Sequence, residues 1–486
     1  MRTQPRLYRR LQREEDGYAL VVATILMFVM MILVVVGLDA GTSALQQSQR
    51  GIEWSRTLSV AENGVNDAMA RLSADRSSAS ACSTSTSSVC STDNGQYQVS
   101  WSTASDGSIT IDSYGYFPTK AASKISRHLR VTMEPAPAFT NALFAQDSIQ
   151  IKNNEKIVGD IYSQLGVTIG NNAEICGSIV VANGDVTMTN GATAQKTDVS
   201  LNCSGKGGSV WAGGSILNSG RIYGDAKASG PSGTTCSAAS TSYQITGGTV
   251  DGNATACGRI TGTVSGVNRW PGIPTTQPAV QPLPAYTFDP ANYPGIHCYP
   301  SGGTCGATTS TTAVTLANAA IAATRTNLMG TYAIWQTTPS QSTIVSLDGI
   351  VLGGDTTIVT NAPIDFGNTD TVGLTSGVTK ATFTVISLYQ PTGTCSDQGG
   401  DCSIYGKNAI VFAKGDATDL SDGVAGLLYT TGKMGFKNKP AMEGALYAGS
   451  MDIKNGFDIV YNPRIANILG FGSSLQPSLW EELDVG

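Results

Sequence analysis

Histidine and charged residues are scarce in this sequence. Only two histidines occur among 486 residues, and because no CxxC spacing is present, zinc is a poor explanation for the cysteines. Charged residues make up 14% of the chain and the formal net charge is −6, which argues against a broad nucleic-acid-binding surface. The motifs GxSxG and HExxH and the P-loop are also absent. These absences exclude several common hydrolase, metalloprotease and nucleotide sites.

Glycine, serine, threonine and alanine dominate instead, with 56 glycines, a composition typical of a β-rich, turn-rich protein outside the cytosol. The ten cysteines are even in number. Three pairs are close in sequence, and each would close a loop of roughly eight residues with about 2.5 kcal/mol of stabilisation. We expect disulfides, with buried thiols as the alternative, and leave the pairing of the other four cysteines open. The proposed pairs are Cys82/Cys90, Cys298/Cys305 and Cys395/Cys402, and the unassigned cysteines are Cys176, Cys203, Cys236 and Cys257.

A long apolar segment lies near the N-terminus. Residues 18–38 are uncharged, and as a helix they would span about 31 Å, the thickness of one hydrocarbon core. A secretory signal would have a shorter apolar core followed by a small-residue cleavage site. Five arginines precede the segment, so the N-terminus is expected in the cytoplasm and the bulk of the chain outside it.

A second helical pattern follows the apolar segment. Two sets of three apolar residues repeat at a spacing of seven, separated by a slip of one position. This stripe either packs against its own domain or against neighbouring helices in an assembly. The residues are Leu38, Leu45 and Ile52, then Leu58, Val65 and Leu72.

The leader, Gly17, Tyr18, "ALVV", the apolar span and the helix "SVAENGVNDAMARL" (59–72) resemble a type IV pilin or PilX-like precursor. The resemblance implies a prepilin peptidase that cuts between Gly17 and Tyr18. Major pilins carry Glu at the fifth mature position, where it neutralises a neighbour's N-terminal amine, whereas this chain carries Val22. Val22 avoids an unpaired carboxylate in the membrane and removes that salt bridge, which favours a minor, tip or initiating subunit. An uncleaved signal anchor is the alternative.

Short alternating segments between residues 97 and 133 predict three or four antiparallel strands after a Ser/Thr-rich loop. A helix followed by a small antiparallel sheet is the pilin-like module. The segment "EPAPAF" (134–139) reads as a linker, because each proline biases the preceding residue away from helix.

The middle and the end of the chain contain a repeat of about 18 residues. "IQIKNNEKIVGDIYS" starts at 149 and "VTIGNNAEICGSIVV" at 167, while "MGFKNKPAMEGALYA" starts at 434 and "MDIKNGFDIVY" at 451. A constant period with Asn/Gly corners predicts the coils of a β-solenoid, with a β-sandwich as the alternative. The "SIQIKNN…GDIYS" pattern resembles bactofilin-like and PilX-associated β-solenoid domains.

The predicted fold is therefore mainly β, with a long N-terminal transmembrane helix, a small antiparallel sheet and a β-solenoid. A Pro-rich segment and a helix over 313–328 interrupt the repeats, and the final residues read as a cap for the open end of the solenoid. The predicted divisions are a leader (1–17), the transmembrane and stalk helix (18–76), the antiparallel sheet (77–134), the first solenoid part (135–267), the Pro-rich and helical excursion (268–330), the second solenoid part (331–470) and the cap (471–486).

No catalytic constellation stands out, because the acids are dispersed and the two histidines lie in different regions. His128 and His297 are expected to be structural. The spacing of Asp416, Asp419 and Asp422 does not fit an EF-hand loop, so a solvated turn is expected. Lysines recur in "KNN", "KNK" and "KNG" and could form a basic edge for anionic glycans, but a simple solvated face is the favoured interpretation. These lysines are Lys152, Lys437 and Lys454.

The sequence favours a non-enzymatic minor or tip component of a type IV pilus-like filament, anchored in the membrane and displaying the solenoid for adhesion or assembly. Its expected partners are prepilin peptidase, other pilin-like subunits, the membrane and surface glycans, with no nucleic acid and no cofactor. A carbohydrate-active β-helix enzyme and a self-polymerising, bactofilin-like envelope scaffold are the two rivals.

Overall fold

A computed structural model describes most of the chain, and it separates into two compact units. The helix unit combines residues 1–136 with residues 474–486, and the parallel-sheet unit comprises residues 137–473. The parallel-sheet unit is thus inserted in the sequence between two parts of the helix unit. The described residues are 8–74, 89–103, 108–135, 138–197, 201–267, 269–293, 295–302, 304–307, 309–367, 371–396, 399–407, 411–413, 420–438, 441–454, 456–466, 471 and 475–483.

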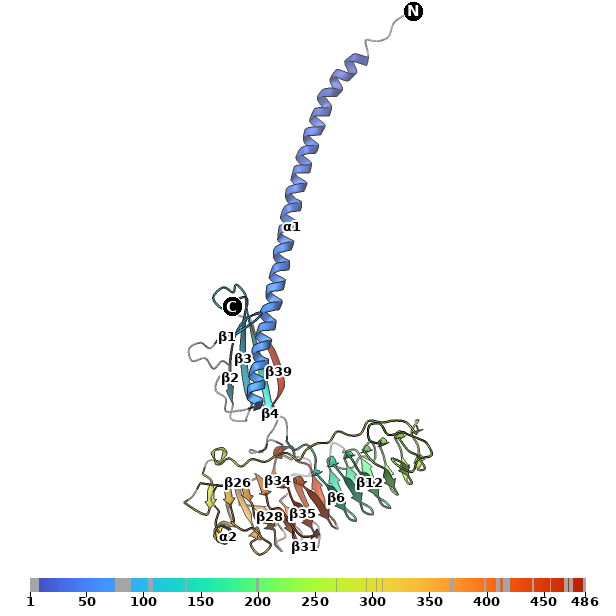
Figure 1. Ribbon diagram of the computed structural model, residues 1–486, viewed down its shortest axis with the longest axis vertical. Helices are drawn as coiled ribbons and strands as arrows, with labels where there is room; N and C mark the ends of the chain where they lie inside the picture. Colours follow the sequence, from blue (N-terminus) through green and yellow to red (C-terminus); the bar gives the residue numbers. More distant parts are fainter. Residues whose placement is uncertain are drawn as a thin grey trace, which may run out of the picture. The chain divides into compact units, whose positions relative to one another are not determined.

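The helix unit is built on α1 (Tyr8–Ala74), a single helix of 67 residues (Figure 1). Its C-terminal part packs against an antiparallel sheet of five strands in the order β1-β2-β3-β4-β39. The sheet alternates buried and half-buried residues, most regularly in β3, as one covered face requires. The strands are β1 (Val89–Thr92), β2 (Gly95–Thr103), β3 (Ile109–Tyr116), β4 (Ser126–Pro135) and β39 (Leu475–Leu483).

The C-terminal segment corrects one prediction. Residues 471–486 were expected to cap the solenoid, but β39 pairs antiparallel with β4 and completes the sheet of the helix unit. An ion pair between Arg127 on β4 and Glu482 on β39 reinforces this pairing, and the guanidinium of Arg127 lies 3.8 Å from the ring centre of Trp54 on α1. The chain therefore returns to the helix unit after the parallel-sheet unit is complete.

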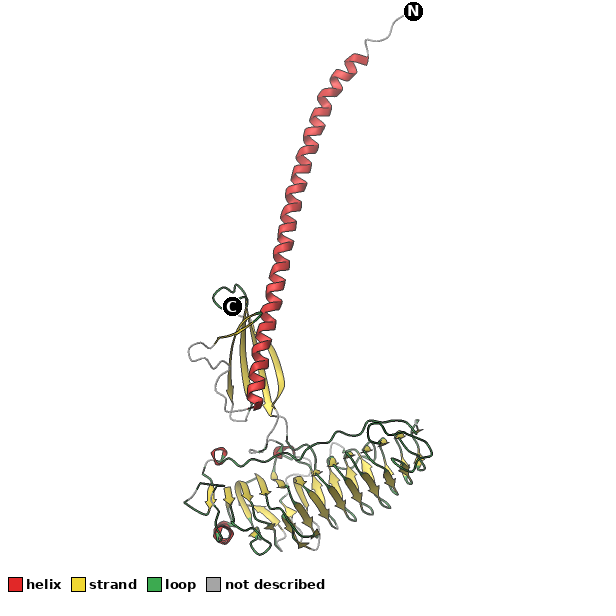
Figure 2. Ribbon diagram, in the orientation of Figure 1, coloured by secondary structure: helices red, strands yellow, loops and turns green. Residues whose placement is uncertain are grey.

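The parallel-sheet unit consists mainly of a 22-stranded and a 10-stranded sheet, and every pairing in them is parallel, unlike the antiparallel sheets of a β-sandwich (Figure 2). Successive turns of the chain place Ile161 beside Ile179 and Ile157 beside Ile175, so the pairing repeats the 18-residue spacing of the sequence. A core of buried Ile, Val, Ala and Phe fills the inside.

The first half of this unit winds through three rows of short strands. The first row contains β5 (Leu143–Ala145), β8 (Ile161–Ser163), β11 (Ile179–Val181), β14 (Val210–Ala212), β17 (Ala226–Ala228), β20 (Ala254–Ala256) and β22 (Arg269–Pro271). The second row contains β6 (Ser148–Ile151), β9 (Gly166–Ile169), β12 (Asp185–Met188), β15 (Ile216–Asn218) and β18 (Ile245–Thr246). The third row contains β7 (Lys156–Val158), β10 (Glu174–Cys176), β13 (Thr193–Gln195), β16 (Arg221–Ile222), β19 (Thr249–Val250) and β21 (Thr263–Val264).

The second half continues the same rows with longer strands. The first row continues with β23 (His297–Tyr299), β24 (Leu328–Ile334), β26 (Val351–Thr360), β29 (Lys380–Ser387), β34 (Gly423–Thr430) and β36 (Ala441–Ala448). The second row continues with β25 (Val345–Ser346), β27 (Ile364–Asp365), β32 (Ile404–Gly406), β35 (Lys433–Phe436) and β37 (Ser450–Ile453). The third row continues with β28 (Thr371–Leu374), β33 (Val411–Phe412) and β38 (Asp458–Val460), and β30 (Cys395–Ser396) and β31 (Gly399–Gly400) form a separate hairpin.

The two halves meet in the middle of the unit. The last turn of the chain pairs with the first, because β36 pairs with β5, β37 with β6 and β38 with β7 (Figure 1, red strands beside teal ones). The chain therefore starts in the middle, winds to one end, crosses to the other end and winds back. Both repeat blocks belong to one continuous stack of paired strands.

The Pro-rich segment 272–293 makes this return, and we call it the strap. It runs extended along the stack (Figure 2), and aromatic side chains of the first row hold it. The hydroxyl of Tyr162 donates to the carbonyl of Ala279 at 3.2 Å, and that of Tyr429 donates to Pro284 at 2.7 Å. Carbonyl acceptors suit a proline-rich strand, because proline has no amide hydrogen to donate.

At the far end of the strap, α2 (Ala313–Thr324) covers the end of the stack. Its buried side chains are Ala313, Val314, Ala317 and Ile321. The predicted helix over 313–328 is thus present, although its last residues belong to β24. It covers the unpaired end that the C-terminal tail was expected to cover.

Asparagine and glycine form the corners of the stack. Asn154 and Asn172 adopt φ values of 59° and 55°, and Gly191 takes the corresponding place one turn later with φ 75°. The amide of Asn171 donates to Oδ1 of Asn153 at 2.9 Å, so the corners also bond to one another. This explains the Asn/Gly pairs of the repeat, because few other residues adopt positive φ at low cost.

Candidate functional site

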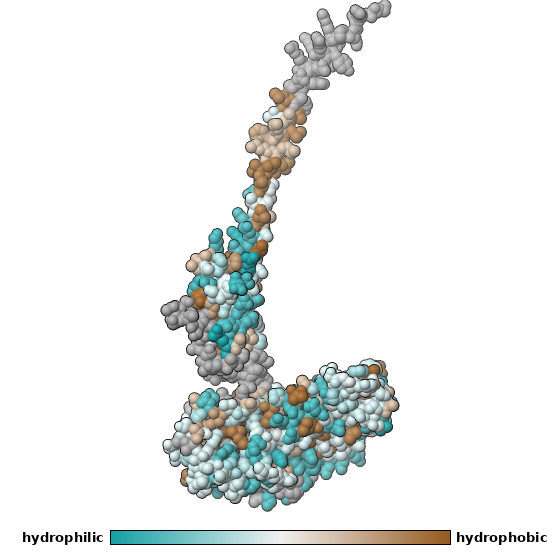
Figure 3. Space-filling model, viewed as in Figure 1, coloured by the Kyte–Doolittle hydropathy of each residue, from teal (hydrophilic) through white to brown (hydrophobic). Residues whose placement is uncertain are grey.

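The N-terminal half of α1 is the first candidate functional element. It contains an 18-residue window with a mean hydropathy of 3.0, none of it buried, which is long and apolar enough to cross a membrane. Figure 3 shows this apolar surface as brown on the upper part of the described helix. An apolar helix without protein neighbours requires lipid or other chains around it.

The last part of α1, from Thr57 on, packs against its own unit instead. Thr57, Ala61, Gly64 and Ala68 face the sheet at helical spacing. The approach is close, because a Cβ on Gly64 would lie 2.3 Å from Oγ of Ser113. That hydroxyl donates to the carbonyl of Ala61 at 2.8 Å.

The apolar stripe predicted on this helix divides accordingly. The first set is exposed, at 64% for Leu38, 66% for Leu45 and 52% for Ile52. Of the second set, Val65 and Leu72 are buried and Leu58 packs against the same core. Six residues separate Ile52 from Leu58, so at about 100° per residue the two sets face about 120° apart. The slip in the repeat thus separates an exposed face from one that packs against the helix's own sheet.

Burial and a carboxylate also act on Tyr97 in this unit. Its hydroxyl lies 3.1 Å from Oδ2 of Asp67, which also pairs with Arg71 one helical turn later. Burial, together with the charge of Asp67, raises the pKa of Tyr97 to about 12. Tyr97 therefore stays a neutral donor that ties β2 to α1.

The proposed cleavage position lies inside α1, between Gly17 and Tyr18, where only the backbone is described. Val22 is 39% exposed on the same helix.

Disulfides clip the loops of the parallel-sheet unit. Cys298–Cys305 and Cys395–Cys402 match the pairs expected from their spacing. Cys90 is also disulfide-bonded, while its proposed partner Cys82 lies outside the described residues. Sequence spacing did not reveal two longer bridges, Cys176–Cys203 and Cys236–Cys257. They became recognisable only once the turns of the stack were in register.

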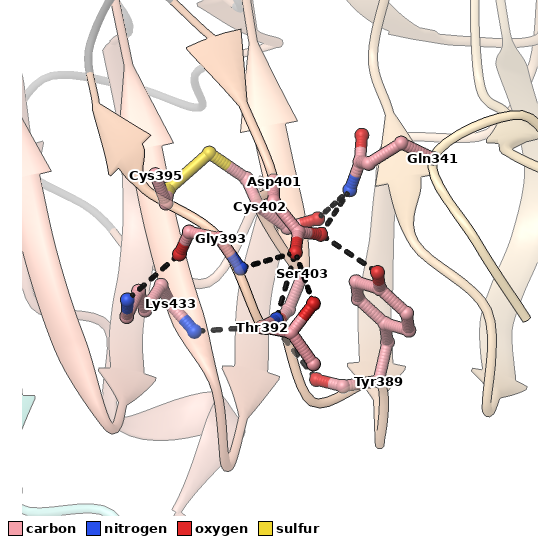
Figure 4. Close-up of a disulfide and its surroundings, with 9 residues drawn as sticks. All are labelled: Gln341, Tyr389, Thr392, Gly393, Cys395, Asp401, Cys402, Ser403 and Lys433. Atoms are coloured by element: carbon pink, nitrogen blue, oxygen red, sulfur yellow. Dashed lines mark hydrogen bonds between the residues drawn. A yellow bond between two sulfur atoms is a disulfide. The ribbon is translucent and has the colours of Figure 1, made fainter.

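Asp401 organises the loop closed by Cys395–Cys402 (Figure 4). Its carboxylate accepts from the hydroxyl of Tyr389 at 2.7 Å and from the amides of Thr392 and Gly393 at 2.7 and 2.6 Å. Burial alone would raise the pKa of Asp401, but these bonds and one from Gln341 outweigh it and hold the pKa below its usual value. Every donor around this carboxylate belongs to the loop or to its neighbours, so the arrangement is structural.

The other candidate acids and histidines are also engaged in the fold. Nε2 of His128 lies 2.7 Å from Oδ1 of Asp112, and the His128 ring stacks on Tyr114. His297 stacks on Tyr332. Asp416 and Asp419 lie outside the described residues. The carbonyl of Asp422 accepts from the guanidinium of Arg464 at 3.1 Å. Within the described ranges, no group of three or more His, Cys, Asp or Glu side chains could hold a metal ion.

The recurring lysines do share one corner. The amides of Lys437, Lys454 and Lys152 donate to the preceding turn of the stack, at Gly406, Phe436 and Ile453. The three lysines therefore occupy the same position in successive turns. The pairing also brings in Lys407, which follows Gly406 as Lys437 follows Phe436. Sequence reasoning missed Lys407, although its "GKN" matches the "IKN" and "FKN" of the other turns.

Comparison with known proteins adds little. No family model and no curated protein matches the sequence. Among solved structures, the competence-associated pilin ComZ from Thermus thermophilus matches with 12% identity and a TM-score of 0.26, covering 88% of this chain and 97% of that one. An overlap at this level establishes neither a shared fold nor a shared function. The function of this chain has to be inferred from its own residues and contacts.

Proposed function

We propose that this protein is a structural, non-enzymatic subunit of a type IV pilus-like filament that displays a β-solenoid outside the membrane. The continuity of α1 carries the proposal: one helix passes from a fully exposed, membrane-length apolar segment into a C-terminal part that packs against an antiparallel sheet. A signal sequence that is removed whole would not need to form one helix with the folded unit.

The exposed set of Leu38, Leu45 and Ile52 supports a role in assembly. These side chains face away from the helix unit's own sheet and need apolar neighbours. Equivalent helices of other pilin-like subunits would supply them. The parallel rows, the repeated pairing and the continuous core support a β-solenoid as the displayed part.

Val22 favours a minor or tip subunit over a repeated shaft subunit. A shaft subunit would use a carboxylate at this position to accept the N-terminal amine of its neighbour, and valine cannot do so. Adhesion by the displayed unit, and priming of assembly, are the two roles that fit such a position.

The α2 helix argues against the self-polymerising scaffold. Stacking end to end would require both ends of the rows to be open, whereas α2 buries Ala317 and Ile321 over one of them. For the rival enzyme, the described histidines and Asp401 are held by structural contacts, which favours the non-enzymatic role.

The mature N-terminus tests the proposal. Mass spectrometry of the protein from membranes should find Tyr18 as its first residue, and Gly17→Leu should abolish processing. Gly41→Leu is the matched control, because no atom lies within 4 Å of a Cβ there. An intact Met1 in the wild type, or normal maturation of the Gly17→Leu protein, would refute the pilin route.

A further inference from the structure

Four lysines form a straight row along one corner of the parallel-sheet unit, and we call it the lysine row. Each follows the last residue of a second-row strand, and those strands pair directly, Gly406 with Phe436, Phe436 with Ile453 and Ile453 with Ile151. Strands in a sheet lie about 4.8 Å apart, so the row spans about 14 Å. Its members are Lys407, Lys437, Lys454 and Lys152.

The row has sharp ends. The next turn beyond Lys152 has Gly170 at this position, and the turn before Lys407 has Gly367. A Cβ on Gly170 would lie 2.1 Å from the carbonyl of Lys152, so a residue with a side chain does not fit there. Four side chains of the same sign thus fill every place between the two glycines.

Stacked like charges are unfavourable for the fold itself. Like charges on adjacent strands destabilise a sheet, and acids compensate part of this row. Lys152 lies 3.9 Å from Asp452, and the charge of Lys407 acts on Asp365. The ammonium groups of Lys407 and Lys437 have no ion pair within the described ranges. An ion-pair network is therefore an incomplete explanation for the row.

A polar hollow lies beside the row. It measures about 360 Å³ and covers the beginnings of β6, β9 and β12 in the second row of strands, whereas Lys152 follows the end of β6. Gln150, whose Oε1 lies 3.2 Å from Nζ of Lys152, connects the two features. Ser148, Thr168, Thr187 and the acid Asp185 are among the residues that line the rest. A ligand that spans both features would meet the positive charge of the row and the hydrogen-bonding groups of the hollow.

From this geometry we infer that the lysine row and the hollow bind a linear, carboxylate-bearing polysaccharide laid along the stack. Lysines at an even backbone spacing match a chain with regularly placed carboxylates, and the hydroxyl, amide and carboxylate groups of the hollow match sugar hydroxyls. A straight edge on a protein with a net charge of −6 does not follow the wound phosphates of duplex DNA. The inference rests on the proposed display function and deepens it by naming the ligand class.

Binding of purified full-length protein in detergent to polygalacturonate tests the inference without requiring filament assembly. The quadruple variant Lys152→Gln, Lys407→Gln, Lys437→Gln and Lys454→Gln should weaken binding about ten- to a hundredfold and flatten its salt dependence. The matched control is Lys196→Gln, Lys206→Gln, Lys227→Gln and Lys380→Gln, which removes the same charge elsewhere on this unit and should bind like the wild type.

Neutral dextran should not bind, and the inference fails if both quadruple variants lose affinity equally. Tighter binding of duplex DNA or inorganic polyphosphate than of polygalacturonate would also overturn it, because the hollow would then contribute nothing to selection. A processed N-terminus together with unchanged binding by the lysine-row variant would leave the pilin proposal intact and remove only this ligand.

Discussion

Two glycines illustrate how single residues set the packing of the helix unit. Gly115 on β3 allows α1 and the sheet to approach until their backbones touch, because a Cβ there would lie 2.1 Å from the carbonyl of Thr57. Gly51, on the same helix, has open space around it. The two positions therefore respond oppositely to the same substitution.

We predict that Gly115→Ala lowers the free energy of unfolding of the helix unit by about 1–3 kcal/mol, since the strand must move away from the helix. Gly51→Ala should leave it unchanged or raise it by up to about 1 kcal/mol, because alanine favours helix. Thermal denaturation followed by circular dichroism measures both. A Gly115→Ala protein as stable as the Gly51→Ala protein would contradict the close approach.

Glu155 is a buried acid at the junction of the two halves of the stack. Its side chain is 1% exposed. One carboxyl oxygen accepts from the amide of Phe457, and the other has no hydrogen-bond partner among the described residues. Burial raises the pKa of Glu155 to about 7, although the bonds from Phe457 and Gly456 oppose it. At the same place one turn on, Ala173 is apolar and buried.

We predict that this acid makes the junction less stable as the pH rises. Between its ordinary pKa near 4.5 and about 7, the folded chain holds a proton that the unfolded chain releases, so stability is fully present below pH 4.5 and falls by up to about 3 kcal/mol towards pH 7 and above. Urea denaturation at several pH values should show this fall in the wild type and lose it in Glu155→Gln. Glu174→Gln, an exposed acid one turn away, should keep the wild-type slope.

At the scale of elements, α2 protects one end of the stack. Ile321 is 2% exposed against the last turn, whereas Leu316 on the same helix is 47% exposed. A charge at Ile321 would have to leave the core and would lift the helix from the strands it covers.

Ile321→Asp should therefore expose β23, β25 and the part of β24 that β23 does not pair, and it should produce soluble oligomers through these free edges. Leu316→Asp carries the same charge on the outer side and should remain in the wild-type state. Light scattering on a gel-filtration column distinguishes the outcomes, and monodisperse Ile321→Asp protein of wild-type size would count against a capping role.

Elements with a strong local signal were predictable, and those fixed by distant partners were not. The period of 18 and the corner asparagines indicated the stacked turns, because every turn repeats the same local requirement. The position of Leu475–Leu483 in the fold depends on pairing with β4, more than three hundred residues earlier. No local pattern distinguishes an edge strand from a cap. Lys407 was missed because its turn departs from the period, and only the strand register aligns it with the other lysines.

At the scale of the molecule, the strap links two halves of the chain that are also joined directly by strand pairing. The pairs β5–β36, β6–β37, β7–β38 and β4–β39 all join residues before the strap to residues after it. No described disulfide crosses it. The covalent link through the strap is therefore needed for the chain to fold into this stack. It contributes much less to keeping the two folded halves together.

A protease recognition site inserted after Val280, which is 54% exposed, tests this. After cleavage the two fragments should elute together from gel filtration and keep the wild-type circular dichroism, and they should separate only in denaturant. Free fragments in buffer would show that the strap, and not the central strand pairs, holds the halves together.

The place in the chain at which the parallel-sheet unit is inserted also determines which bonds would carry tension. The two ends of the parallel-sheet unit meet at its middle, where the amide of Ala138 donates to the carbonyl of Ala466 at 3.0 Å, and in the sequence they continue to β4 and β39, which are neighbouring strands of one sheet. Three of the four turns that carry the lysine row, those of Lys437, Lys454 and Lys152, lie at or next to these two ends. A pull on a bound polymer would therefore pass through the central turns alone, and the outer turns would stay unloaded however long the stack became.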